Sequence, residues 1–185
     1  RIRQDCYLPY SHAIFFISKG GMSVALRSIM NYQADDILRK KARSVDNVNS
    51  RIRSLLEDMA ETMYHADGAG LAAPQVGILR RLVVLDIGEG LIKLINPVIV
   101  EADGEQQEAE GCLSIPGIYG EVKRPEKVVV KALDENGKPL VLEGTGLLAR
   151  ALCHEIDHLD GILFIDKVIP GSLINENNLP EVKTI

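Results

Sequence analysis

His154 and His158 stand four residues apart in the sequence His-Glu-Ile-Asp-His, with Glu155 directly after the first of them. Residues at i and i+4 lie on one face of an α-helix, so both imidazoles can reach a single metal ion. The carboxylate of Glu155 could accept a proton from a water acidified by that metal and return it to a leaving amine. Apolar residues lead directly into the motif and predict a buried segment, so we interpret it as a site of metal-dependent hydrolysis.

A catalytic metal site usually has three protein ligands and one open position, so a third ligand is needed. Cys112 stands in the segment Glu-Gly-Cys-Leu-Ser-Ile-Pro-Gly, where glycine and proline predict a rigid exposed turn that could bring a thiolate to the histidines. Cys153 precedes His154 and points about 100° around the helix, which predicts a buried apolar role. We assign no role to Cys6.

Three other kinds of metal site fit the sequence less well than this set of ligands. A metzincin protease would need a histidine at the position of Phe164, and phenylalanine cannot coordinate a metal. Glu176 could imitate the downstream glutamate of thermolysin-like proteases, but it stands in a polar tail without a helical pattern. A structural metal in a peptide-binding protein would need a closed set of four ligands, and only three fit.

The segment at residues 68–77, Gly-Ala-Gly-Leu-Ala-Ala-Pro-Gln-Val-Gly, is rich in small residues. It lacks the lysine of a phosphate-binding loop and the strand-turn-helix context of a dinucleotide fingerprint. Small residues let a backbone approach a ligand closely, and Gln75 offers a neutral amide that could face an oxyanion.

The elements that must hold these residues can be read from the apolar spacing. Apolar residues at three- and four-residue steps from Val48 predict an amphipathic helix that ends near residues 67–68. A second helix, predicted for residues 147–159, carries the histidines and is closed by Gly161. Strands are predicted at 81–87, 91–100, 127–133 and 140–142, with a hairpin turn at Asn136-Gly137 before the last. Strands in a block before a helix predict an α+β fold.

Composition excludes several classes of protein. The chain has 185 residues, of which 46% are hydrophobic and 25% charged, as is typical of one globular domain. Its formal net charge is -5 and its basic residues are dispersed, so neither direct nucleic-acid binding nor a membrane role is expected. Three cysteines make no even-numbered disulfide framework, which favours a reducing compartment such as the cytoplasm.

Two ends of the chain are expected to lie outside the catalytic domain. Residues 1–21 lead into Met22, which reads like an initiation point, so we expect them to be a vector-derived or leader segment. A fragment of an organellar transit peptide is the minor alternative. We expect a single catalytic domain at residues 22–171 and a short polar tail at residues 172–185.

Together the three motif segments resemble the peptide deformylases. Their signatures are GxGLAAxQ, EGCLS and HExxH, which match here at residues 68–75, 110–114 and 154–158. The resemblance extends from about Met22 to Gly171, with the three motifs in order. It implies an α+β fold in which antiparallel β-sheets pack around a central helix that bears HExxH.

The resemblance also implies roles for individual residues. Cys112, His154 and His158 would bind the metal and Glu155 would be the base. The amide of Gln75 and the backbone N–H of Leu113 would stabilise a tetrahedral oxyanion. The substrate peptide would pair as an added strand with Ala69, Gly70 and Gly111. Its methionine side chain would enter a pocket lined by Leu147, Arg150 and Ala151.

The implied reaction removes formate from the N-terminal formyl-methionine of nascent chains in the bacterial cytoplasm, with an organelle as the alternative. One divalent metal ion is implied, Fe(2+) by preference, and Zn(2+), Ni(2+) or Co(2+) could occupy the same ligands. We expect a monomer, and we doubt transient ribosome association because the tail is short. The rival interpretation is a general metallopeptidase that cleaves unformylated peptides.

Overall fold

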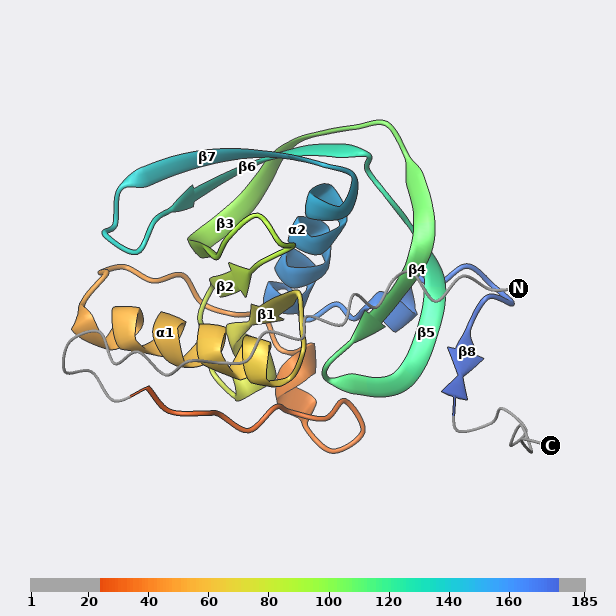
Figure 1. The fold of residues 1–185 in the computed structure, drawn as a ribbon, viewed down its shortest axis with the longest axis horizontal. Coiled ribbons are helices and arrows are strands. Elements are labelled where there is room, and N and C mark those ends of the chain that lie inside the picture. The colour runs from red at the N-terminus through yellow and green to blue at the C-terminus, as the bar shows by residue number, and fades with distance from the viewer. Residues whose placement is uncertain (1–23, 177–185) are drawn as a thin grey trace.

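The computed structural model describes residues 24–176 of the chain. This part forms two α-helices and two β-sheets (Figure 1). The expectations for residues 1–21, for Cys6 and for the last nine residues of the tail fall outside the described residues. The helical elements are α1 (Ser50–His65), α2 (Gly146–Leu159) and the short 3₁₀ helices η1 (Asp36–Arg39), η2 (Ala73–Val76) and η3 (Phe164–Asp166).

Every strand pairing is antiparallel. The larger sheet has the order β1-β2-β3-β6-β7 and the smaller one the order β4-β5-β8. The strands of the larger sheet are β1 (Gly70–Ala72), β2 (Leu82–Leu85), β3 (Ile92–Asp103), β6 (Lys127–Leu133) and β7 (Pro139–Thr145), and those of the smaller sheet are β4 (Gln106–Cys112), β5 (Ile115–Arg124) and β8 (Ile174–Asn175). β1 and β4 are therefore edge strands within residues 24–176.

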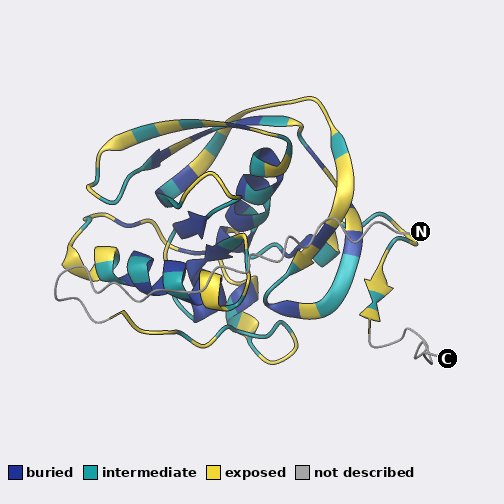
Figure 2. Ribbon diagram, viewed as in Figure 1, coloured by how far each residue is buried: buried dark blue, intermediate teal, exposed yellow. Residues whose placement is uncertain are grey.

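β2 is a continuous apolar run because a helix covers each of its faces. Successive side chains of a strand point to opposite faces. Val83 and Leu85 belong to a core cluster with α2, whereas Leu82 and Val84 belong to one with α1. Figure 2 shows the result as buried residues concentrated on β1, β2, α2 and one face of α1.

One end of each main helix has a clear cause in the sequence. The side chain of Asn49 accepts a hydrogen bond from the backbone N–H of Ile52 and so caps α1. After α2, Gly161 takes a φ of 75°, and a Cβ there would lie 2.6 Å from the backbone oxygen of Arg39. Only glycine fits such a close approach with a left-handed backbone.

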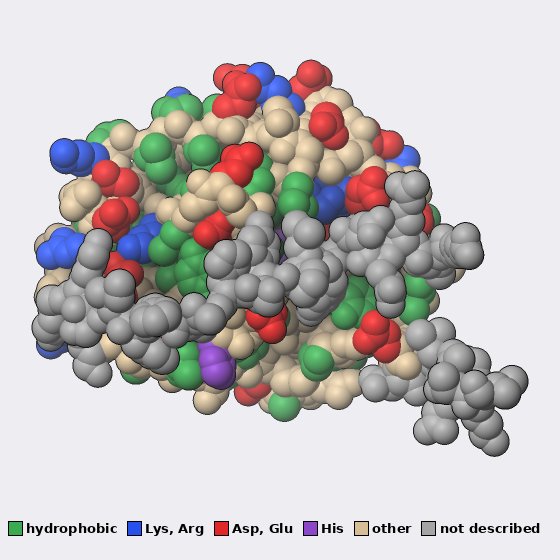
Figure 3. Space-filling model, in the orientation of Figure 1, with side chains coloured by type: hydrophobic (Ala, Val, Ile, Leu, Met, Phe, Trp, Pro, Cys, Tyr) green, Lys and Arg blue, Asp and Glu red, His purple; other side chains and the backbone are tan. Residues whose placement is uncertain are grey.

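The α+β prediction is confirmed, and both predicted helices and all four predicted strands are present. The strand predicted at residues 127–133 has those bounds, and the other elements have at least one shifted end. The predicted hairpin turn is also present, with Gly137 at a φ of 78°. On the face shown in Figure 3, acidic and basic side chains are interspersed. Neither described helix is long and apolar enough to cross a membrane.

The turn predicted after Cys112 is present at residues 113–114, but the prediction that it is exposed is wrong. Cys112 pairs with Ile115 in a β4–β5 hairpin, and Ser114 between them is fully buried. β4 and β5 were not predicted. Polar residues occupy most positions of β4, so its sequence shows little of the apolar alternation that indicates a strand. The start of the predicted tail also forms structure, since Ile174 pairs with Tyr119 in β5.

Candidate metal centre and active site

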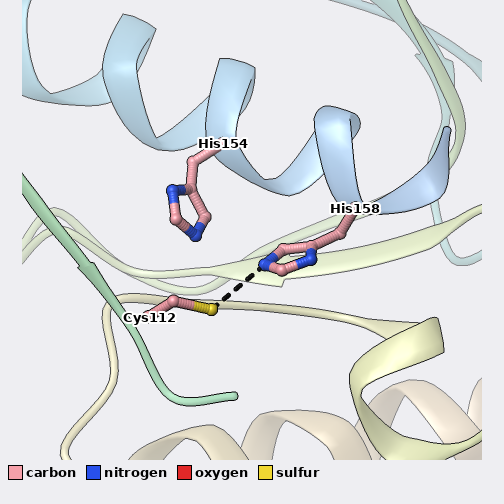
Figure 4. Close-up of side chains that lie close together, drawn as sticks. All are labelled: Cys112, His154 and His158. Carbon is pink, nitrogen blue, oxygen red and sulfur yellow. Dashed lines mark hydrogen bonds between the residues drawn. The ribbon is translucent and has the colours of Figure 1, made fainter. Parts of the chain in front are cut away.

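Two elements bring together three side chains that could bind a metal ion. His154 and His158 project from α2, and Cys112 is the last residue of β4 (Figure 4). One ligand atom from each residue lies within 4.8 Å of the others, and Cys112 Sγ is 3.3 Å from His158 Nε2. The hairpin around Cys112 thus carries the thiol to the helix face on which both histidines stand.

The donor set fits a divalent metal ion. Metal–sulfur distances of roughly 2.3 Å and metal–nitrogen distances of roughly 2.0 Å in a tetrahedron place the ligand atoms about 3.5 Å apart. The distances between the three ligand atoms lie within 4.8 Å, and the one from Cys112 Sγ to His158 Nε2 is 3.3 Å, so they bracket this value. Three protein ligands leave one position for water or substrate, as in catalytic centres.

His154 is held from behind by Glu110. The Nδ1–H of His154 donates to Glu110 Oε2 over 2.9 Å, which leaves Nε2 free to face the metal. Glu110 is buried, and burial alone would raise its pKa. Hydrogen bonds from Arg124 and His154 outweigh that effect and lower the pKa of Glu110 to about 2. The carboxylate therefore remains ionised and can orient His154.

A chain of paired charges continues outward from Glu110 to the surface. Arg124 donates from Nε and Nη2 to the two carboxylate oxygens of Glu110, at 2.8 and 2.9 Å. Arg124 also donates from Nη1 to Asp157, which accepts from the Nζ of Lys167 at 2.7 and 2.8 Å. Asp157 stands inside the predicted motif, but the spacing gave no reason to assign it this role.

His158 has no comparable support. Its Nδ1 atom is buried and has no hydrogen-bond partner among the described residues. Burial lowers the pKa of His158 well below its usual value, which favours the neutral imidazole that a metal requires. Its ring meets that of His154 edge to face, with the ring centroids 5.0 Å apart.

Glu155 is buried beside the ligands without being one of them. Its Oε2 atom also lacks a hydrogen-bond partner in residues 24–176, and burial raises the pKa of this carboxyl to about 7. A carboxyl that titrates near neutral pH can both accept and return a proton. Gly70 leaves room for it, because a Cβ at residue 70 would lie 2.4 Å from Glu155 Oε1.

Gln75 is fixed in η2 so that its amide nitrogen faces the thiol. Its Oε1 accepts from the backbone N–H of Ala72 at 2.8 Å, which determines the orientation of the amide. Nε2 then donates to Cys112 Sγ at 3.5 Å and to Ser114 Oγ at 3.3 Å. Leu113 lies in the adjacent turn, and a Cβ on Gly68 would meet its side chain at 2.6 Å.

The residues expected to pair with a peptide lie beside open sheet edges. Gly70 begins β1, Ala69 directly precedes it, and Gly111 is in β4. Among residues 24–176, β1 pairs with β2 alone and β4 with β5 alone. Tyr119 packs against Gly111, where an added Cβ would lie 2.7 Å from its ring.

The residues expected to line a methionine pocket differ among themselves. Leu147 is exposed and Ala151 is half-buried. Arg150 is buried, and its Nη1 donates to Glu110 Oε1 at 2.8 Å and to the backbone oxygens of Glu108 and Val122. Its Nη2 is buried without a partner in the described region. The head group of Arg150 thus belongs to the support of Glu110.

Besides Asp157, sequence reasoning missed four residues around the centre. Glu110 was visible beside Cys112 in its motif but was given no role. Arg124 carried no signal at all, since nothing in its surroundings indicates a buried ion pair. Phe164, considered only as a non-ligand, stacks on His154 with ring centroids 6.1 Å apart. Ser114 binds the amide of Gln75.

Comparison with known proteins gives concordant matches. The family model described as polypeptide deformylase matches residues 26–172. A peptide deformylase of Thermoanaerobacter pseudethanolicus is 62% identical over 151 residues, which cover 82% of this chain and 94% of that protein. One from Acetivibrio thermocellus is 66% identical over 135 residues, covering 73% and 79%.

Solved structures agree with these matches. A crystal structure of a peptide deformylase from Legionella pneumophila has a TM-score of 0.76 and 49% identity, covering 79% of this chain and 88% of that one. The structure from Thermotoga maritima has a TM-score of 0.77 and 42% identity, covering 79% and 99%. A peptide deformylase from Synechococcus elongatus, solved in complex with actinonin, has a TM-score of 0.74.

Proposed function

The chain belongs to the polypeptide deformylase family, and we propose that it uses Cys112, His154 and His158 to hold the metal ion of this reaction. It is a metal-dependent hydrolase that removes the N-terminal formyl group from the formyl-methionine of nascent polypeptides and releases formate. The observation that carries the residue assignment is the convergence of the three ligand atoms within 4.8 Å. As in the family's fold, α2 is the central helix that presents HExxH between the sheets.

Glu155 is the proton-transferring base of the proposed mechanism. A metal ion on the three ligands would supply Lewis acidity that makes a water nucleophilic at neutral pH. Glu155 takes the proton that this water loses when it attacks the formyl carbon, and then delivers it to the leaving nitrogen. The unpartnered Oε2 and a pKa of about 7 support both steps.

Gln75 and Leu113 act on the oxygen of the formyl group. As water adds to the carbonyl carbon, that oxygen gains negative charge, and hydrogen-bond donors already in place stabilise it. Gln75 Nε2 and the backbone N–H of Leu113 are the two donors. The amide of Gln75 is supported in this role by its bond to Ala72, which points the nitrogen toward Cys112.

The substrate peptide binds between the two sheet edges. Backbone groups of Ala69 and Gly70 on one side and of Gly111 on the other pair with it as an added strand. The open edges of β1 and β4 support this assignment. The methionine side chain enters a pocket formed by Leu147, Ala151 and the aliphatic stem of Arg150, whose charged head is engaged by Glu110.

Fe(2+) is the proposed physiological metal, and Zn(2+), Ni(2+) or Co(2+) would occupy the same ligands because all accept imidazole nitrogen and thiolate. The proposed setting is the bacterial cytoplasm, where nascent chains carry formyl-methionine. The protein acts there as a monomer on peptides leaving the ribosome, without direct nucleic-acid binding.

Formate release from a formyl-methionyl tripeptide tests the proposed function. Protein purified anaerobically and loaded with Fe(2+) is expected to release one formate per peptide and to leave the unformylated tripeptide intact. Cleavage of the unformylated tripeptide or of casein, without formate release, would support a general metallopeptidase and overturn the proposal.

A further inference from the structure

Residues 25–32, which we call the strap, run from α1 to the two loops that carry the proposed oxyanion donors. The first half is tied to α1. The backbone N–H of Ala25 donates to Asp58 Oδ1 at 2.9 Å, and that of Arg27 donates to Thr62 Oγ1 at 3.0 Å. The guanidinium of Arg27 also donates twice to Asp58 Oδ2, at 2.7 and 3.1 Å. In Figure 1 this stretch, coloured red to orange, extends along α1.

The two anchors on α1 are polar side chains buried on an otherwise apolar helix face. Asp58 is 7% exposed and Thr62 is 3% exposed, and neither contributes to the metal centre. Burying a carboxylate or hydroxyl costs free energy unless it is hydrogen-bonded. The strap donates to both side chains, while the Thr62 hydroxyl itself donates to the backbone oxygen of Asp58 at 2.7 Å within α1. Thr62 thus uses its hydroxyl to connect the strap to the helix backbone.

The second half of the strap crosses to the active-site loops. The N–H of Met30 donates to the backbone oxygen of Gln75 at 2.8 Å, and the N–H of Tyr32 donates to that of Ser114 at 3.0 Å. Gln75 follows edge strand β1 and Ser114 follows edge strand β4, so the strap joins the two sheets. One further bond, from Gln75 Nε2 to Ser114 Oγ at 3.3 Å, crosses between the same two loops.

Packing reinforces these bonds. Met30 and Tyr32 lie against a buried cluster that includes Ile115, the residue directly after Ser114. Leu113, whose N–H is the second proposed donor, directly precedes Ser114. Fixing the backbone oxygen of Ser114 therefore fixes the peptide segment that presents the Leu113 N–H.

We propose that the strap is a positioning element for deformylation, which fixes the spacing between the Gln75 amide and the Leu113 N–H, with Asp58 and Thr62 as its anchors. This inference rests on the proposed function, because it presumes that those two groups bind the oxyanion. Donors stabilise an oxyanion only when held at hydrogen-bond distance from it. A displacement of about 1 Å caused by a remote change can lower a rate by about 10²-fold.

The anchor is tested with a matched pair at residue 62. Thr62→Val keeps the shape of the side chain and removes its hydroxyl, whereas Thr62→Ser keeps the hydroxyl. We expect Thr62→Val to lower kcat about 10-fold, with KM and iron content unchanged, and Thr62→Ser to retain the activity of the unmutated protein. A Thr62→Val protein with a lower melting temperature and full kcat would overturn the proposal.

A double-mutant cycle separates positioning from general destabilisation. Met30→Pro removes the N–H that binds Gln75, and we expect kcat to fall about 10- to 100-fold. In a Gln75→Ala background the same change should have little further effect, because the amide it positions is already absent. Tyr32→Pro, which acts through Ser114, should remain costly in both backgrounds.

The outcomes distinguish a failure of the strap proposal from a failure of the proposed function. Equal losses from Met30→Pro in both backgrounds, with the unmutated protein releasing formate, would overturn the strap alone. Absence of formate release from the iron-loaded unmutated protein would overturn the proposed function and the strap with it. If Met30→Pro does not fold, the same cycle is run with Thr62→Val, and losses of equal size in both backgrounds again overturn the strap.

Discussion

The two histidines of the metal centre have opposite surroundings. Behind His154, paired charges run from Glu110 through Arg124 and Asp157 to the partly exposed Lys167. On the other side, His158 Nδ1 and Glu155 Oε2 are both buried and have no hydrogen-bond partner in the described part of the chain. On the His154 side, Nη2 of Arg150 is buried without a partner among the described residues.

This difference separates groups that hold the centre from a group that reacts in it. A buried polar atom without a partner costs roughly 1–3 kcal/mol. A paired network is rigid, and its members resist changes in protonation. In the proposed mechanism Glu155 changes protonation during the reaction, so a permanent hydrogen-bond partner would oppose that role. We therefore expect substitutions around His158 and Glu155, the open side, to lower the rate of catalysis. Substitutions in the charge network behind His154, the paired side, should lower the stability of the fold.

The largest effect is expected at Cys112, where both sides meet. Cys112→Ser replaces a thiolate with a poor ligand, so metal should be lost on gel filtration and formate release with it. The loss of metal affinity should exceed the roughly 10- to 100-fold typical of a residue behind a ligand. Cys153→Ser, in the α2 core, is the matched control and should keep its metal; equal metal content in both variants would contradict the ligand assignment.

Glu155→Ala should come next. The variant should bind metal normally, because Glu155 is not a ligand, while kcat falls by about 10²- to 10⁴-fold, equivalent to about 3–5 kcal/mol of barrier. Metal analysis and formate release on the same preparation check both halves. Near-native kcat in this variant would show that another group transfers the proton.

Glu110 should govern acid stability on the paired side. Its pKa is about 2 in the folded protein against an ordinary value of 4.5. A group with a lowered folded pKa stabilises the protein above its unfolded pKa, and that contribution is lost as pH falls through the folded pKa. The difference corresponds to about 3 kcal/mol, present at pH 7 and disappearing between roughly pH 4.5 and 2.

Urea unfolding of the metal-free protein at several pH values checks this predicted loss of stability at low pH. Glu110→Gln should be much less stable than the unmutated protein at pH 7, and the two should converge as pH approaches 2. Glu108→Gln, which changes an exposed carboxylate of the same strand, is the control and should track the unmutated protein throughout. A constant gap between Glu110→Gln and the unmutated protein at every pH would show that the carboxylate charge is not the cause.

The smallest effect is expected at the outer end of the paired chain. The side chains of Lys167 and Asp157 are 39% and 14% exposed, and an ion pair this close to solvent contributes about 0–1 kcal/mol. Lys167→Ala should lower stability by no more than that and leave formate release within about two-fold. A loss of metal affinity in this variant would instead extend the functional network to the surface.

The motif residues were predictable because their chemistry follows from short-range geometry. The spacing of His154 and His158 needs only a helix to place both on one face, and that helix is present. The resemblance to deformylases then linked Cys112 and Gln75 to the same site, and the structure brings them together. None of this required knowledge of long-range contacts.

The support around the motif was not predictable, because it depends on where distant side chains meet. Arg124 lies fourteen residues from Glu110 on the neighbouring strand, and neither strand was predicted. Arg150 was predicted from its helical position as part of a pocket, but the direction of its guanidinium depends on the buried carboxylate that it meets. The strap has no sequence motif, since the hydrogen bonds of Met30 and Tyr32 join backbone atoms to backbone atoms.

The open edges of β1 and β4 also bear on aggregation. An unpaired sheet edge is a template for any extended chain. If the substrate binds by strand addition, as proposed, the same edges offer a surface on which copies of the protein could polymerise. β1 offers only three residues, and exposed side chains on β4 include Gln107 and Glu108. Shortness and charge thus keep both edges available to a passing peptide while making them poor nuclei for self-assembly.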